Sequence, residues 1–400
     1  MEKNIIFWNP WWREKFAGFD LKERSVFQDM KALLRRKEIV FLTGVRRSGK
    51  TSVLYHIIES LLQTVPKENI LYINLDDEVL QFEKLEDIYS AYDRLQPDRK
   101  GKTYIFLDEI QNIEGWERWV KNRYDSLEDI KFYITGSKSH VLKRTSSLLT
   151  GRIIEKEIFP LGLFDLLRFK DAPLGKLDKV ALDGRYLSLF KEYLRYGGFP
   201  EVVLERDRSL KKLLLKGYYD DIKDKDIVRN FDIREAKKFD RLSLFVISNI
   251  AKPFSASKIA QATDLSTSVV DKYLDYAELM YFFFPLKHFN YSVKKQITMP
   301  RKIYPVDTGF IDSISFRFSE DKGRLLEAAV FLSLRSLNKE VFYYQGNYEC
   351  DFLVMERGKV KEAIQVCYQL DETNRKREFA GLREAMKRFN IKKGKIITYQ

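Results

Sequence analysis

The segment GVRRSGKT, Gly44 to Thr51, constrains the fold of this chain more than any other. It matches the pattern G-x-x-x-x-G-K-[ST] in full. A β-branched run, EIVFLT, precedes it, and SVLYHIIESLL, which has helical spacing, follows it. Because loop amides and a helix N-terminus then point at one place, this arrangement binds phosphates. The sequence therefore predicts a parallel α/β domain with a phosphate site at the end of this strand.

The positions of the loop have distinct expected roles. Lys50 is expected to reach the β- and γ-phosphates, and the Thr51 hydroxyl is expected to bind Mg²⁺. The predicted nucleotide-binding residues are Gly44, Val45, Arg46, Arg47, Ser48, Gly49, Lys50, Thr51 and Ser52. The alternative is a glycine-rich turn without a ligand.

A second segment, TYIFLDEIQ at residues 103–111, predicts a hydrophobic strand that ends in two acids. Asp108 is expected to hold Mg²⁺ through water, and Glu109 to polarise the attacking water. The strand FYIT ends at Thr135, and Ser137 beyond it is a candidate sensor of the γ-phosphate. These residues predict ATP hydrolysis with ATP and Mg²⁺ as cofactors. The alternative for the two acids is a solvated strand end.

Arg152 comes just before another expected strand, in LLTGRIIEKEIFPL. An arginine at this place could reach the phosphate of a neighbouring subunit and stabilise the charge of the transition state. It therefore predicts a homo-oligomer in which Arg152 acts in trans. The alternative is an ordinary surface arginine at a helix end.

The composition is that of a globular protein in which basic residues outnumber acidic ones. Of the 400 residues, 44% are hydrophobic, and the longest apolar runs, such as LMYFFFPL, fall far short of the ~20 residues that span a membrane. The N-terminus has no secretory pattern, and the two cysteines form no disulfide framework, so a cytoplasmic protein is expected. The net charge of +13 favours a polyanionic partner such as DNA. The alternative is a Lys- and Glu-rich surface of the heat-adapted kind.

The segment from Phe239 to Phe289 predicts three helices, at 239–251, 255–263 and 267–281, followed by an aromatic strand. Ser255 and Ser266 are expected to cap the second and third helices. This spacing is typical of a winged-helix domain, whose third helix would expose Ser266, Thr267, Ser268 and Lys272 to DNA. The alternative is a helical packing domain that touches no nucleic acid.

The motifs in their order resemble the AAA+ ATPases, and more closely an archaeal and bacterial ATPase family. Its motifs G-x-R-R-x-G-K-T (Walker A), L-D-E-I-Q (Walker B), T-G-S, G-R, P-L and G-G-F-P-E all occur here, at Gly44 to Thr51, Leu107 to Gln111, Thr135 to Ser137, Gly151 and Arg152, Pro160 and Leu161, and Gly197 to Glu201. The resemblance covers nearly the whole chain. Lys138 departs from it, since the family has a small polar residue there.

The resemblance implies four domains in an α/β chain. They are an AAA+ P-loop ATPase domain at 1–165, a helical lid at 166–235, a winged-helix-like domain at 236–300 and a restriction-endonuclease-like α/β domain at 301–400. The family pattern continues beyond Gln400, so the last domain is expected to be truncated.

The last domain is expected to be an inactive nuclease. Sites of this type use a helix acid, a strand Asp, and an acid and a lysine two residues apart on the next strand. Glu327 and Asp351 match, whereas Gln365 and Cys367 replace the acid and the lysine. We therefore expect a nuclease fold kept for DNA or protein contact.

Three functions are compatible with these patterns. The first is an AAA+ ATPase that couples ATP turnover to DNA binding or remodelling. The second is an ATP-dependent, metal-requiring DNA nuclease. The third is a nucleotide-controlled protein-interaction switch, which would not respond to nucleic acid.

Overall fold

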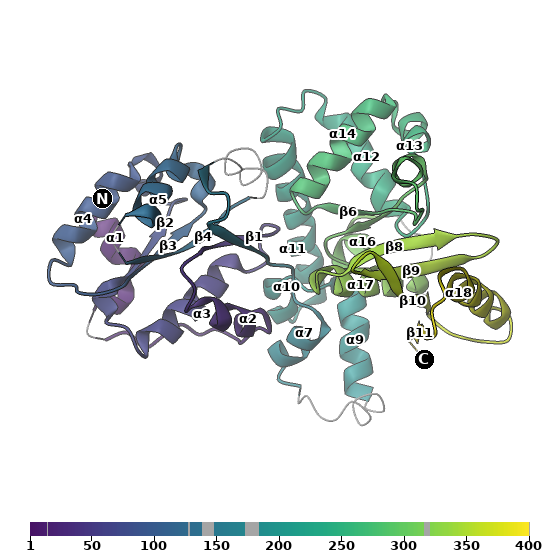
Figure 1. Cartoon of the computed structure of the whole chain (residues 1–400), viewed down its shortest axis with the longest axis horizontal. Coiled ribbons are helices and arrows are strands. Elements are labelled where there is room, and N and C mark those ends of the chain that lie inside the picture. Colours follow the sequence, from purple (N-terminus) through teal and green to yellow (C-terminus); the bar gives the residue numbers. More distant parts are fainter. Residues whose placement is uncertain (14, 127–128, 138–147, 173–183, 316–320, 400) are drawn as a thin grey trace. The chain divides into compact units, whose positions relative to one another are not determined.

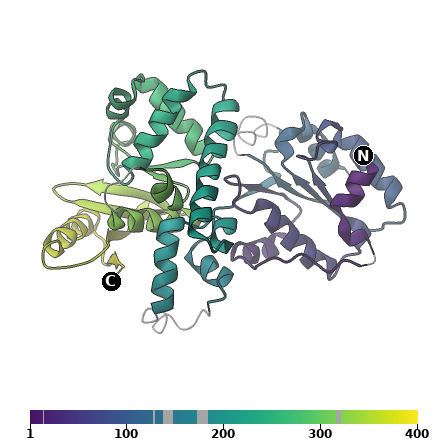
Figure 2. The same cartoon turned by 180° about the vertical axis from the view of Figure 1, so that it is seen from behind.

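The computed structural model describes all residues except 14, 127–128, 138–147, 173–183, 316–320 and 400. The chain forms two compact units, Met1–Ile158 and Phe159–Gln400, each described by itself (Figures 1 and 2). Within the described part of the chain, every helix is too short or too polar to span a membrane.

The first unit is built on a five-stranded parallel sheet with the order β2-β3-β4-β1-β5. The strands are β1 (Ile39–Thr43), β2 (Ile70–Asn74), β3 (Thr103–Asp108), β4 (Ile130–Thr135) and β5 (Ile153–Glu157). The helices are α1 (Glu2–Trp8), α2 (Val26–Leu33), α3 (Lys50–Leu62), α4 (Leu85–Leu95) and α5 (Trp116–Asp125). Short 3₁₀ turns are η1 (Pro10–Trp12), η2 (Lys67–Asn69), η3 (Leu80–Phe82) and η4 (Ile110–Asn112). The parallel α/β fold expected from the sequence is confirmed.

Helices cover both faces of this sheet because its inner strands are apolar along most of their length and are buried on both faces. On β1, Phe41 points into a core with residues of α4 and α5, whereas Val40 and Leu42 point into a core with α2 and α3. A strand buried on both faces has a continuous apolar sequence, as EIVFLT does. The parallel strands therefore end at one edge, where β1, β3 and β4 present their last residues.

The N-terminal segment closes the free edge of β2. The Asn9 side chain donates to the Tyr72 carbonyl at 2.8 Å and accepts from the Tyr72 amide at 2.8 Å, as a neighbouring strand would. Trp12 stacks on Tyr92, and α1 lies beside α4 and β2 in both views (Figures 1 and 2). Because an open edge strand can pair with other chains, this segment protects the sheet.

The second unit begins with helices and ends with a mixed sheet. Its helices are α7 (Leu163–Phe169), α9 (Gly184–Tyr196), α10 (Pro200–Leu204), α11 (Arg208–Asp221), a π-helical turn η5 (Ile222–Arg229), α12 (Ala236–Ser248), α13 (Ala256–Thr263), α14 (Thr267–Leu279), α15 (Val293–Thr298), α16 (Gly309–Ile314), α17 (Lys322–Ser336) and α18 (Arg375–Phe389). Its strands are β6 (Phe283–Leu286), β7 (Lys302–Pro305), β8 (Glu340–Gln345), β9 (Glu349–Glu356), β10 (Lys359–Cys367) and β11 (Gly394–Thr398).

Helices α12, α13 and α14 precede a two-stranded antiparallel sheet of β6 and β7. The three helices exist as expected, although α12 begins and ends three residues earlier than the range 239–251 predicted for it. Ser255 and Ser266 cap α13 and α14 as predicted, since their hydroxyls accept from the amides of Lys258 and Val269. Local capping chemistry therefore fixed these two helix starts.

The C-terminal sheet has the order β11-β10-β9-β8. Strands β8, β9 and β10 pair in antiparallel fashion, and β11 pairs parallel with β10. Helices α17 and α18 both pack on β10 (Figure 1). Both cysteines, Cys350 on β9 and Cys367 on β10, are buried free thiols.

The turn of the GGFPE segment is fixed by Asp307. Its two carboxylate oxygens accept from the amides of Gly198 at 2.7 Å and Gly309 at 2.8 Å. Burial raises the pKa of Asp307 to about 7, against the effect of the two amides. Gly197 has a φ of +72°, and a Cβ there would lie 1.5 Å from an Asp307 oxygen. The glycine and the aspartate therefore hold α9 and α10 against the start of α16.

Candidate functional site

The loop after β1 has the backbone that its glycines permit. Gly44 has a φ of +144°, and a Cβ there would lie 2.2 Å from the Ile158 carbonyl oxygen. Gly49 has a φ of +90° and forms the N-cap of α3. The Lys50 ammonium lies over the loop, where the carbonyls of Gly44 and Val45 accept from it at 3.2 and 3.3 Å. The loop is thus curled around the lysine at the N-terminus of α3.

The remaining loop residues divide between the interior and the surface. Val45 and Ser48 are buried, whereas Arg46 and Arg47 are exposed. The buried Arg24 donates to the Ser48 carbonyl at 2.6 Å, so the segment before α2 supports the loop. Sequence reasoning missed Arg24, and no local pattern marks it.

Asp108 is the centre of a hydrogen-bonded group at the carboxyl edge of the sheet. Its carboxylate accepts from the hydroxyls of Thr51 at 2.7 Å, Tyr72 at 2.8 Å and Thr135. Burial raises the pKa of Asp108, against the hydrogen bonds from Thr135 and Thr51. Side chains from three elements, α3, β2 and β4, therefore converge on this carboxylate at the end of β3, next to the loop.

Glu109 follows Asp108 with a φ of +57°, a strained value for a residue other than glycine. Its amide donates to the Thr135 hydroxyl at 2.9 Å, and the Gln111 amide nitrogen donates to its carboxylate. The Ser137 amide donates to the Gln111 side-chain oxygen at 3.3 Å. Gln111 thus links the Glu109 carboxylate to the segment after β4, a role that the sequence motif alone did not assign. Lys138, where the chain departs from the family pattern, lies outside the described residues.

The donor set beside the loop suits a magnesium ion. The Thr51 hydroxyl oxygen and the Asp108 carboxylate oxygen are hard oxygen donors 2.7 Å apart, and Mg²⁺ prefers such ligands. Both residues were predicted for this role, and the structure brings them together.

Arg152 lies at the opposite end of the sheet from the loop. Its carbonyl accepts from the amide of Ile39, the first residue of β1, at 2.8 Å. Its guanidinium pairs with both oxygens of Asp125 at 2.9 and 3.1 Å. Within one chain, Arg152 is therefore not part of the site around Lys50.

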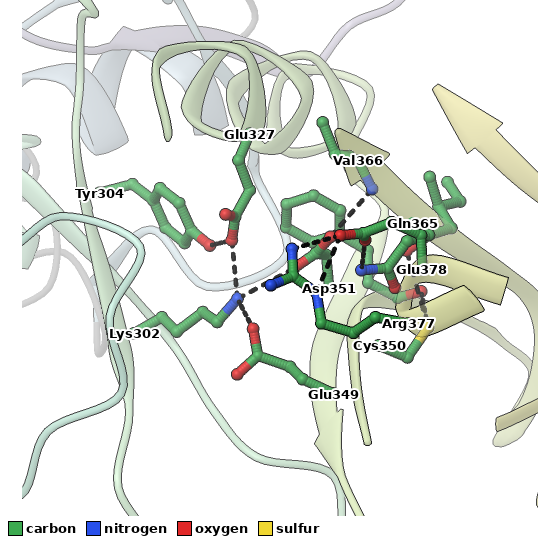
Figure 3. A network of polar contacts seen from close by, with 12 residues as sticks. Lys302, Tyr304, Glu327, Glu349, Cys350, Asp351, Gln365, Val366, Arg377 and Glu378 are labelled. Carbon is green, nitrogen blue, oxygen red and sulfur yellow. Dashed lines mark hydrogen bonds and ion pairs between the residues drawn. The ribbon is translucent and has the colours of Figure 1, made fainter. Parts of the chain in front are cut away.

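In the second unit, Glu327 of α17 and Asp351 of β9 are buried close together, as predicted (Figure 3). A lysine lies between them. The Lys302 ammonium, from β7, is 2.7 Å from Glu327, 3.2 Å from Asp351 and 2.8 Å from Glu349. The Tyr304 hydroxyl donates to the same Glu327 oxygen at 2.7 Å. We call Lys302, Tyr304, Glu327, Glu349 and Asp351 the C-terminal acidic cluster.

The charges in this cluster depend on one another. Burial alone would lower the pKa of Lys302, but the facing carboxylates, Glu327 above all, raise it well above its usual value. Burial raises the pKa of Glu327 to about 7, against the charge of Lys302, and it also raises the pKa of Asp351. Lys302 is therefore the stable cation of the cluster.

Gln365 and Cys367 lie on β10, the strand that pairs with β9. The Gln365 amide donates to Glu378 of α18 at 2.8 Å (Figure 3). Burial raises the pKa of the Cys367 thiol, so it stays neutral at pH 7. Neither residue supplies the acid or the cation that a nuclease site needs at these positions.

Sequence reasoning missed Lys302, Tyr304 and Glu349. The two lysines nearest to Gln365 in the sequence on the same strand, Lys359 and Lys361, are both exposed on β10. The available signal was RKIYP, where alternation puts a lysine and a tyrosine on one face of a strand otherwise made of apolar residues.

Two family models and several relatives match this chain. The family model described as "AAA domain" matches residues 36–167, and a domain of unknown function (DUF8612) matches residues 187–321. The uncharacterised protein MJ1544 of Methanocaldococcus jannaschii is 35% identical over 391 residues, covering 94% of this chain and 86% of the relative. An uncharacterised protein of Haemophilus influenzae is 29% identical over 346 residues, covering 84% and 83%.

Among solved structures, the ORC1 protein of Aeropyrum pernix in complex with DNA matches with a TM-score of 0.32 and 15% identity. The match covers 72% of this chain and 90% of that one. At this score the likeness supports no inference about function.

Proposed function

This chain belongs to the family of the uncharacterised protein MJ1544 of Methanocaldococcus jannaschii, and an AAA-domain model matches its residues 36–167; we propose that it binds ATP with Mg²⁺ and hydrolyses it to ADP and phosphate. One observation carries the proposal. The hydroxyl of Thr51, in the phosphate loop, donates to the Asp108 carboxylate at 2.7 Å, and Glu109 is the next residue. A phosphate ligand, a metal ligand and a general base therefore lie at one edge of the sheet.

Each residue has a separate part in the proposed reaction. The loop amides from Val45 to Thr51 bind the phosphates, and Lys50 moves from the loop carbonyls to the β- and γ-phosphates. Thr51 and Asp108 would hold Mg²⁺, which when bound neutralises charge on the phosphate oxygens. Glu109 accepts a proton from the attacking water. Ser137 senses the γ-phosphate, and Gln111 connects it to Glu109.

Arg152 supports the proposal of a homo-oligomer. Its guanidinium is held by Asp125 at the end of the sheet remote from its own loop, and its side chain is about one-third exposed. The Arg152 guanidinium could therefore reach the nucleotide site of a neighbouring subunit, where it would stabilise the charge of the transferred phosphoryl group.

For the second unit we propose DNA as the partner and the domain division expected from the sequence: a lid at 166–235, a winged helix at 236–300 and a nuclease-like domain from 301 onward. The order of elements is that of a winged-helix domain: helices α12 to α14 come first, and the β6–β7 pair follows them. A β-bridge also joins Phe254 to Arg301. Asp271, an acid on the expected recognition helix, is neutralised by an ion pair with Arg301.

The connection between β6 and β7 is the basic part of this region. Its helix α15 buries none of its residues, and Lys294 and Lys295 are exposed on it. Ser266, Thr267, Ser268 and Lys272 are exposed on and before α14. Because lysines neutralise phosphates and release counterions, these residues favour a salt-sensitive contact with DNA.

The coupling of ATP turnover to DNA is tested by steady-state hydrolysis with single-stranded, duplex and branched DNA across a salt series. DNA is expected to stimulate hydrolysis, with an effect that falls steeply as salt rises. Replacing Lys294 and Lys295 together with alanine should lower the salt slope of DNA binding by about two, since each phosphate contact contributes about one.

The matched control replaces Lys3 and Lys15, two exposed lysines of the first unit, with alanine. This change should leave the slope unaltered. Hydrolysis that responds to none of the DNAs would refute the DNA proposal and direct attention to protein partners, while ATP hydrolysis itself would stand. We do not propose a nuclease, because Lys302 lies among the acids that would bind its metal.

A further inference from the structure

The C-terminal acidic cluster surrounds the Lys302 ammonium with carboxylate oxygens. The side chain of Lys302 has no exposed surface, and one oxygen each of Glu327, Glu349 and Asp351 lies 2.7 to 3.2 Å from its nitrogen (Figure 3). These acids come from α17 and β9, whereas the lysine comes from β7. Segments distant in sequence thus meet at one nitrogen atom.

Other donors hold the carboxylates in place around this nitrogen. The Tyr304 hydroxyl donates to Glu327 at 2.7 Å, and the Val366 amide donates to the second oxygen of Asp351 at 2.9 Å. Carboxylate oxygens are also the ligands that a hard divalent cation prefers in proteins. An ammonium has three N–H donors, so it can satisfy three oxygens at the same point.

A cation of some kind is required here. Buried carboxylates without a counter-ion are strongly unfavourable, and three acids face one lysine. Among the residues that the structure describes, no group of three or more His, Cys, Asp and Glu side chains is arranged to hold a metal ion. The lysine nitrogen is at the place where the three carboxylates converge.

We propose that Lys302 is a built-in cation that takes the place of a divalent metal ion between Glu327, Glu349 and Asp351. The wild-type cluster binds no divalent metal, and it is held together by an ammonium that cannot dissociate. Among the described residues, Thr51 and Asp108 then remain the ligands proposed for Mg²⁺. This inference does not depend on ATP hydrolysis.

The test measures binding of Mn²⁺, a paramagnetic probe, to the full chain without nucleotide. Wild-type protein and Asp351→Asn should bind Mn²⁺ equally, because the wild-type cluster holds no metal ion. Lys302→Met, which keeps the apolar stem and removes the charge, should gain one site. Adding Asp351→Asn to Lys302→Met should abolish this new Mn²⁺ site.

Lys361→Met, at an exposed lysine on β10, is the matched control and should bind Mn²⁺ as wild type does. Lys302→Gln repeats the test if circular dichroism shows that Lys302→Met is unfolded. A folded Lys302 variant without a new site would overturn the proposal. So would wild-type Mn²⁺ binding that depends on Asp351, a result that needs no Lys302 variant.

Discussion

Glu109→Gln is expected to lower the rate of ATP hydrolysis by about 10²–10⁴-fold while leaving the affinity for ATP nearly unchanged. Glutamine keeps the size and the hydrogen bond of the side chain but cannot accept a proton from water. Glu109 follows the buried Asp108, and its amide is held by Thr135, so its backbone position does not depend on its charge. The loss should therefore fall on kcat rather than on binding.

The measurement is phosphate release at saturating Mg·ATP, with equilibrium binding of a fluorescent ATP analogue beside it. Glu114→Gln is the matched control, since Glu114 is an exposed acid a few residues further along the same connection. It should hydrolyse ATP at the wild-type rate. A Glu109→Gln protein that keeps the wild-type rate would remove Glu109 from the mechanism.

Lys302→Met is expected to reduce the free energy of unfolding of the second unit by about 3–5 kcal/mol, because it leaves buried carboxylates without their cation. The loss should be smaller where Glu327 becomes protonated, since burial raises its pKa to about 7. A neutral Glu327 no longer needs a counter-ion. Because the charge of Lys302 lowers the pKa of Glu327, this pKa should be higher still in Lys302→Met, and the effect should grow as the pH rises above about 7.

The two units can be followed separately in this experiment. All five tryptophans, Trp8, Trp11, Trp12, Trp116 and Trp119, lie in the first unit. Urea unfolding followed by tryptophan fluorescence should be unchanged in Lys302→Met, whereas the far-UV circular dichroism of the second unit should be lost at lower urea. A change below about 1 kcal/mol at pH 8 would mean that the ammonium contributes little.

The nucleotide site could be predicted from sequence because its residues are few, local and ordered along the chain. Gly44 to Thr51 form one loop and the start of α3, and Asp108 ends a strand with a clear apolar run. In a parallel sheet, the carboxyl ends of β1 and β3 share an edge, so local patterns were enough to bring Thr51 and Asp108 together. The caps at Ser255 and Ser266 were predictable for the same local reason.

The C-terminal acidic cluster could not be predicted in this way. Glu327 and Asp351 were found because each sits on an element with a clear pattern. Lys302 was missed because β7 is a four-residue strand that pairs with β6, and its place beside α17 depends on tertiary packing. A sequence pattern gives the face on which a residue lies but not the distant element that this face meets.

We propose that the site around Lys50 hydrolyses ATP. The first measurement to make is phosphate release by the wild-type protein and by Lys50→Ala. The alanine variant loses the cation that contacts the β- and γ-phosphates. We expect Mg²⁺-dependent phosphate release by the wild-type chain and none above background by Lys50→Ala. Equal release by the two proteins, or none by a folded wild-type chain with any of the DNAs, would contradict it.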